Sequence, residues 1–150
     1  MIFPYIPDIV YSPEDGEPDA IVRPIIPVEL RGPKGTGNFF ALVDTGADYS
    51  ILPKRIADAL GISLLPSAGP ALVALGGQEL NVFYGEVQLQ LAADQETLIW
   101  NLQAQFYDYP QGTDESLVLG FIGFLEFLNA FFDSENETLT ITPNAFFSPT

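Results

Sequence analysis

The segment Ala41-Leu42-Val43-Asp44-Thr45-Gly46-Ala47-Asp48 decides how this chain is interpreted. An apolar run over 39–43, bounded by turn residues, predicts a short buried strand. That strand delivers Asp44 to its end, where Gly46 allows a sharp backbone turn and the close approach of a ligand. An acidic side chain in this position is a candidate catalytic residue. The simpler alternative is an ordinary turn in which the carboxylate hydrogen-bonds its own backbone.

Short strand-like segments flank this core on both sides. Residues 21–30 read as extended chain, and their prolines suit an edge strand. Residues 71–75 and 80–84 predict a hairpin with Gly76 and Gly77 at its tip. Polar and apolar residues alternate over 86–91, which is typical of a half-buried strand. Further strands are expected at 50–52, 98–107, 117–120, 131–133 and 139–142.

Two segments predict short helices. Pro53 begins the first, which places Ile56 and Leu60 on one face, and Gly61 follows as a C-terminal cap. The second is expected over 123–129. Many short strands with one or two short helices describe an all-β, barrel-like domain.

The composition excludes several kinds of chemistry. The 150 residues are 47% hydrophobic, which fits one domain with a core. The chain has no His and no Cys, so His-assisted nucleophiles and the common zinc sites are excluded, and we expect no metal and no other cofactor. A net charge of −15 argues against nucleic acid and anionic membranes as partners. Because no signal peptide or transmembrane segment is visible, we expect a soluble, cytoplasmic protein.

The chain divides into three expected parts. Residues 1–20 form an acidic, Pro-rich N-terminal arm, 21–143 the main domain, and 144–150 a C-terminal tail. We expect the arm to be poorly packed unless something holds it, although its opening apolar residues could dock as an edge strand. Self-processing that removes the arm is an alternative that the sequence leaves open.

The order and spacing of these blocks resemble the retropepsin-like aspartic proteases, the single-domain relatives of the retroviral enzymes. The resemblance spans about residues 21–142 and implies a retropepsin-like β-barrel that is active as a twofold homodimer. It is carried by Arg23-Pro24, the Leu-Val-Asp-Thr-Gly-Ala-Asp core, Leu75-Gly76-Gly77, Val118-Leu119-Gly120, and a terminal hairpin from Phe131-Phe132-Asp133 to Thr138-Leu139-Thr140-Ile141.

The resemblance implies an aspartic endopeptidase that hydrolyses peptide or protein substrates. In that chemistry two carboxylates hold one water between them and share a proton, because two close like charges do not both ionise cheaply. This chain carries a single Asp-Thr-Gly, so the second Asp44 must come from a second copy across a twofold axis. We expect activity to peak at acidic pH, because one carboxyl must hold its proton.

The resemblance also assigns roles around the catalytic Asp44. Thr45 and Gly46 would support the active-site loop, with Thr45 hydrogen-bonding across the dimer axis. Arg23 is a candidate partner for Asp48, including from the opposite subunit; the alternative is an ordinary surface charge. The residues expected to bind substrate, the last three as a flexible flap that excludes water, are Gly46, Ala47, Asp48, Leu75, Gly76 and Gly77.

One departure from the family concerns the support of this loop. The family often places a polar pair after the glycine that corresponds to Gly120, whereas this chain has Phe121 and Ile122. The loop must then be braced by apolar contacts or by another group. This departure and the strong acidity keep an alternative function open: a non-catalytic peptide-binding or interaction module on the same fold.

Overall fold

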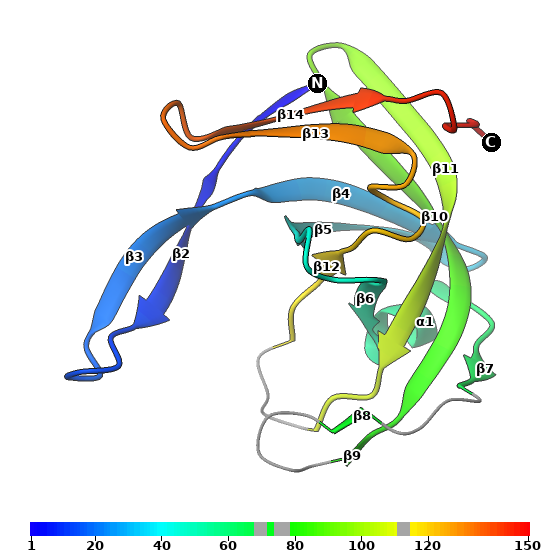
Figure 1. Cartoon of the computed structure of the whole chain (residues 1–150). Coiled ribbons are helices and arrows are strands. Elements are labelled where there is room, and N and C mark those ends of the chain that lie inside the picture. The colour runs from blue at the N-terminus through cyan, green and yellow to red at the C-terminus, as the bar shows by residue number, and fades with distance from the viewer. Residues whose placement is uncertain (68–71, 74–78, 111–114) are drawn as a thin grey trace.

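The chain folds into β-sheets with one short helix, α1 (Lys54–Leu60), in its described part (Figure 1). The computed structural model describes residues 1–67, 72–73, 79–110 and 115–150. This architecture confirms the all-β fold class. The strands are β1 (Ile2–Pro4), β2 (Ile6–Tyr11), β3 (Pro18–Arg23), β4 (Ile25–Gly32), β5 (Gly35–Val43), β6 (Ser50–Pro53), β7 (Leu65–Pro66), β8 (Leu72–Val73), β9 (Glu79–Leu80), β10 (Val82–Ala93), β11 (Glu96–Tyr107), β12 (Val118–Leu119), β13 (Leu128–Asp133) and β14 (Thr138–Pro143).

The main sheet closes into a barrel. Its strand order is β11-β6-β12-β5-β4-β10-β7, and β10 also pairs along its whole length with β11. Side chains alternate between the two faces of each strand, so every second residue enters the interior. The largest fully buried side chains include Trp100, Phe106 and Phe124. These rings, packed with Leu and Ile residues, form the hydrophobic core that holds the strands in register.

The helix α1 forms where the sequence predicts it. Pro53 precedes its first turn, and Ile56 and Leu60 are buried on one face. The helix ends at Gly61, whose left-handed φ of 72° lets its N–H return to the carbonyl of Ala57. The second predicted helix, over 123–129, is wrong: the chain makes turns there and then enters β13.

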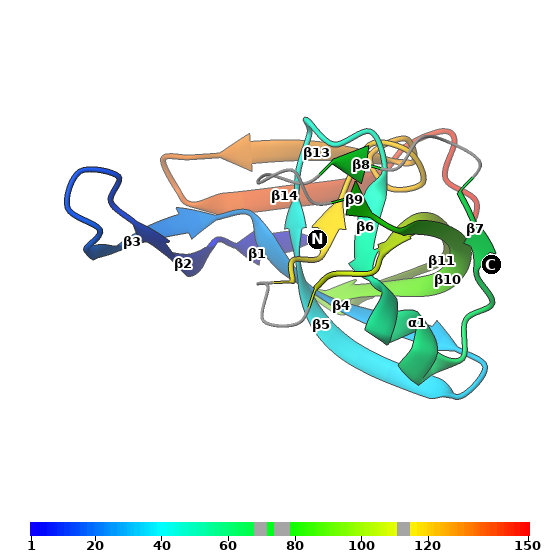
Figure 2. The ribbon, with the colours of Figure 1, turned by 90° about the horizontal axis from the view of Figure 1, so that it is seen from below.

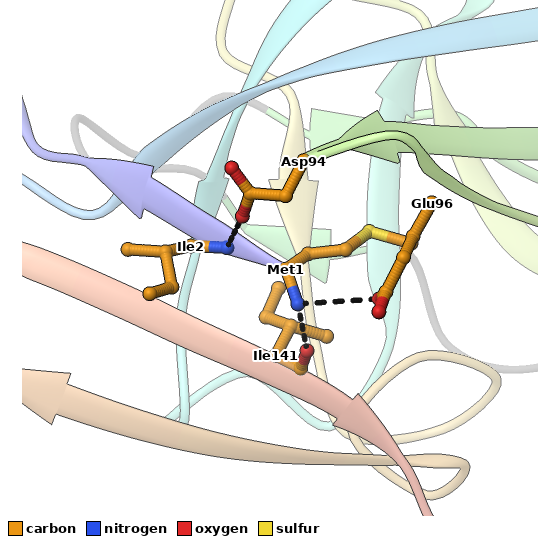
Figure 3. Close-up of polar contacts among 5 residues, drawn as sticks. All are labelled: Met1, Ile2, Asp94, Glu96 and Ile141. Atoms are coloured by element: carbon orange, nitrogen blue, oxygen red, sulfur yellow. Dashed lines mark hydrogen bonds and ion pairs between the residues drawn. The ribbon is translucent and has the colours of Figure 1, made fainter.

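The N-terminal strand β1 is the outer strand of a three-stranded sheet, β1-β14-β13. The amine of Met1 donates to the carbonyl of Ile141 at 3.0 Å and lies 3.6 Å from the carboxylate of Glu96 (Figure 3). The N–H of Ile2 donates to Asp94 at 2.9 Å. The opening residues therefore dock as an edge strand; the expected boundary of the arm at residue 20 stays a prediction.

The strands β2 and β3 form a separate two-stranded ribbon. It extends the lines of β1 and β4 outward and projects from the body of the molecule (Figures 1 and 2). The ribbon turns at residues 12–17, which carry three of its acidic side chains. Much of the predicted N-terminal arm is thus ordered strand that lies beside the barrel rather than within it.

Candidate active site

The Asp-Thr-Gly segment occupies the loop between β5 and β6, and the strand topology fixes its position. The short strand β12 inserts between these two strands, parallel to β5 and antiparallel to β6. The chain leaving β5 must therefore pass over the end of β12 before it enters β6. This crossing places the loop against the residues that follow β12.

Asp44 is half-buried at the start of this loop. Its backbone N–H donates to the carbonyl of Leu119 at 3.0 Å, which ties the end of β5 to β12. Its carboxylate Oδ1 accepts the N–H of Gly46 at 2.8 Å. A backbone N–H held against a carboxylate oxygen fixes the rotamer of the side chain. This is the turn hydrogen bond expected of an ordinary turn Asp; it orients the carboxylate and is common to both predictions for Asp44.

Two backbone hydrogen bonds join the loop to the segment after β12. The N–H groups of Phe121 and Ile122 donate to the carbonyls of Ala47 and Asp48, both at 2.8 Å. Gly120 lies so close to the loop that a Cβ there would sit 2.4 Å from the carbonyl oxygen of Tyr49. Only glycine allows this approach, and the two segments consequently support each other through their backbones.

A third contact comes from Ser50, which the sequence reasoning did not single out. Ser50 is fully buried, and its Oγ accepts the N–H of Gly120 at 3.1 Å. The signal available in the sequence was a lone hydroxyl at the start of an otherwise apolar strand. A buried polar side chain needs a partner, and the partner here is the backbone below the loop.

These contacts answer how the loop is braced without a polar pair after Gly120. The side chains of Phe121 and Ile122 are 55% and 36% exposed. Backbone groups of the same two residues and the hydroxyl of Ser50 are hydrogen-bonded at the brace. Of the two predicted solutions, apolar packing or another group, the described residues show hydrogen bonds of the second kind.

A hollow of about 290 Å³ lies beside the loop and is lined by Ala47, Asp48, Tyr49, Ile51, Gln105 and Tyr107. Tyr107 donates its hydroxyl to Oε1 of Gln105 at 3.1 Å, and Gln105 donates in turn to the hydroxyl of Tyr84. Burial raises the pKa of Tyr107 above its ordinary value, so this hydroxyl stays a donor across the neutral range. The hollow is at the lower limit of ligand pockets, which start near 300 Å³, and suits one side chain of a longer ligand.

The other predicted site residues fall into two groups. Thr45, Gly46 and Asp48 are exposed on the loop, and Ala47 is half-buried. Arg23 lies instead at the base of the ribbon, where its Nε is 3.3 Å from the carboxylate of Asp8. Within one chain the structure therefore pairs Arg23 with Asp8.

The predicted flap is only partly within the described residues. The short strands β8 and β9 pair antiparallel, as expected for a hairpin. The three residues expected to bind substrate there, Leu75, Gly76 and Gly77, lie outside the described residues. Among the described residues, no three or more acidic side chains are grouped so that they could hold a metal ion. The described part of the chain also contains no helix that could serve as a membrane span.

Neither a family model nor a curated protein matches this sequence. Solved structures do match, among them EIAV protease complexed with the inhibitor HBY-793. The two chains are 22% identical over 74% of this chain and 86% of that chain, with a TM-score of 0.39. At this level of similarity the assignment of function has to rest on the geometry of the loop itself.

Proposed function

We propose that the chain is an aspartic endopeptidase that acts as a homodimer, with one Asp44 from each subunit. The observation that carries this proposal is the position of Asp44: it is half-buried at the end of β5, on a loop whose backbone is joined to the segment after β12. The loop that carries Asp44 is held by the segment after β12, which contacts it through Ser50 and through backbone hydrogen bonds. Such preorganisation is what a catalytic carboxylate requires.

In this mechanism the two Asp44 carboxylates face each other across the twofold axis and hold one water. Like charges at that distance share a proton, so one carboxylate is ionised and the other is protonated. The ionised group takes a proton from the water, and the protonated group donates a hydrogen bond to the scissile carbonyl. The reaction then needs a weakly acidic solution, in which the pair keeps its shared proton.

The substrate would lie extended across the loop. The exposed backbone of Gly46, Ala47 and Asp48 offers donors and acceptors for a strand-like peptide. One side chain of that peptide would enter the hollow between Asp48 and Tyr107. The resemblance to retropepsin-like proteases gives Leu75, Gly76 and Gly77, which lie outside the described residues, the role of a flap that would exclude water.

Arg23 would change partners when the dimer forms. In one chain it pairs with Asp8, and both side chains are more than one third exposed. An exposed pair of this kind contributes about 0–1 kcal/mol, so exchanging Asp8 for the partner subunit's Asp48 costs little. The intersubunit pair would then help to position the loop that carries Asp44.

The test is the variant Asp44→Asn, assayed on an unstructured apolar peptide over a range of acidic pH. Asparagine keeps the oxygen that accepts the N–H of Gly46, so the loop should retain its shape while cleavage is abolished. Asp19→Asn, on the ribbon, is the matched control and should cleave as the wild type does. Cleavage by a purified, folded Asp44→Asn variant at the wild-type rate would remove the proposal.

A non-catalytic peptide-binding module is the second candidate. It is favoured by the exposed side chains of Phe121 and Ile122, whose backbones are hydrogen-bonded to the loop and which could contact an apolar peptide. This candidate requires wild-type protein that binds a peptide without cleaving it at any pH, with the same affinity in Asp44→Asn. Cleavage that depends on Asp44 decides against it.

A further inference from the structure

The ribbon formed by β2 and β3 has two faces of different chemistry. Residues directly opposite each other in the pairing share a face. One face, which we call the open face, carries no charged side chain, and all six of its residues are exposed. Its members are Pro7, Ile9, Tyr11, Pro18, Ala20 and Val22.

The opposite face is charged and partly covered. It holds the ion pair between Asp8 and Arg23, and both residues line a small hollow of about 190 Å³ at the base of the ribbon together with Glu115 and Phe40. Asp19 adds a further carboxylate to this face. The charges of the two strands are therefore gathered on one side, and the other side is left apolar.

The open face is an unusual surface for this chain. Ile9 is 67% exposed and Tyr11 72% exposed, although the chain as a whole carries a net charge of −15. A two-stranded ribbon that pairs with no other described strand is marginally stable by itself in water. Contiguous exposed apolar side chains on such an element mark a surface that becomes buried in a complex.

We propose that the open face packs against the open face of a second copy of this chain. Contact around a twofold axis requires a self-complementary surface, and an uncharged apolar face meets that requirement directly. Two molecules that each carry a net charge of −15 repel one another. The open face is a place where they can approach without opposing carboxylates.

The size of the open face indicates that it is one part of a larger interface. A stable interface buries about 800 Å² on each partner, more than six side chains of a narrow ribbon supply. The ribbon contact therefore adds to the contact between the Asp44 loops. The inference rests on the proposed function in this one respect, that a second copy completes the site.

The first test compares Ile9→Lys with Ile21→Lys by sedimentation equilibrium. Both variants make the same substitution and the same charge change, but Ile21 lies on the charged face. Each lysine lowers the net negative charge, so weaker association cannot come from added repulsion. We expect Ile9→Lys to weaken dimerisation by at least about tenfold and Ile21→Lys to leave it within about threefold of wild type.

The second test uses the absence of cysteine from the chain. A single cysteine in Ala20→Cys, opposite Ile9 on the open face, should form a disulfide-linked dimer on mild oxidation, whereas Asp19→Cys should not. Equal effects of the two lysines, together with no preference between the two cysteines, would overturn the ribbon contact in a wild type that still dimerises. A wild type that stays monomeric at every concentration would overturn the proposed function as well.

Discussion

The hydroxyl of Ser50 gives the sharpest energetic prediction. Ser50→Ala removes the hydroxyl that accepts the buried N–H of Gly120 at 3.1 Å. A buried donor left without a partner costs about 1–3 kcal/mol. The change in volume is a single atom, so no sizeable cavity adds to this cost. Near the middle of that range, about 2 kcal/mol corresponds to a fall in Tm of roughly 4–8 °C for a chain of this length.

Urea unfolding followed by tryptophan fluorescence measures this loss, because Trp100 is the single tryptophan and lies in the core. Ser134→Ala is the control: it removes a hydroxyl from an exposed turn and should change the free energy of unfolding by less than about 0.5 kcal/mol. We also expect Ser50→Ala to reduce peptide cleavage, since the loop loses part of its support. A Ser50→Ala variant as stable as Ser134→Ala would refute the claim that this hydroxyl braces the loop.

Three further predictions concern other parts of the molecule. Gly120→Ala places a Cβ 2.4 Å from a backbone oxygen of the loop, so it should lower the free energy of unfolding by about 1–3 kcal/mol or more. Thermal unfolding measures this loss, and an unchanged Tm would contradict the close approach. Trp100→Phe should lower the free energy of unfolding by about 1–3 kcal/mol, because it removes the hydrogen bond from Nε1 to the buried carbonyl of Gly123. The near-UV absorbance of tyrosine can follow the unfolding of this variant. A variant as stable as the wild type would count against this bond. Hydrogen bonds, chiefly from the side chain of Asn136, lower the pKa of Asp133 below its ordinary value of 3.8, so their stabilisation is present above that value and is lost as the pH falls through the lowered pKa. Asp133→Asn should therefore be less stable than wild type in urea near neutral pH and equal to it in strong acid; a difference independent of pH would contradict this assignment.

Much of the fold was predictable because local signals and tertiary packing agree. Pro53 and Gly61 delimit α1 by their own backbone preferences, and no distant contact is needed to place them. The helix predicted over 123–129 failed for the opposite reason. Leu128 is spaced as a helical neighbour of Phe124, but it pairs in β13 with Pro143 of β14. Sheet pairing across the C-terminal hairpin decided the conformation, and that pairing is not visible in the local pattern.

The candidate site divides in the same way. The position of Asp44 at a strand end followed from the apolar run before it, which is a local feature. The role of Ser50 depends on β12 inserting between two earlier strands, so its partner is 70 residues away in sequence. The ribbon was expected to be a poorly packed arm because its prolines and acidic residues obscure the alternation. Its two faces become evident only when the register of β2 and β3 is known.

The most direct test of the central claim is a subunit-mixing experiment. Wild-type protein at a fixed amount is mixed with increasing Asp44→Asn protein, allowed to exchange subunits, and assayed for peptide cleavage. If each site needs two Asp44 carboxylates, activity per wild-type subunit should fall in direct proportion to the wild-type fraction, because mixed dimers are inactive. If activity per wild-type subunit stays constant across the titration, a single subunit forms a complete active site, and the account is contradicted.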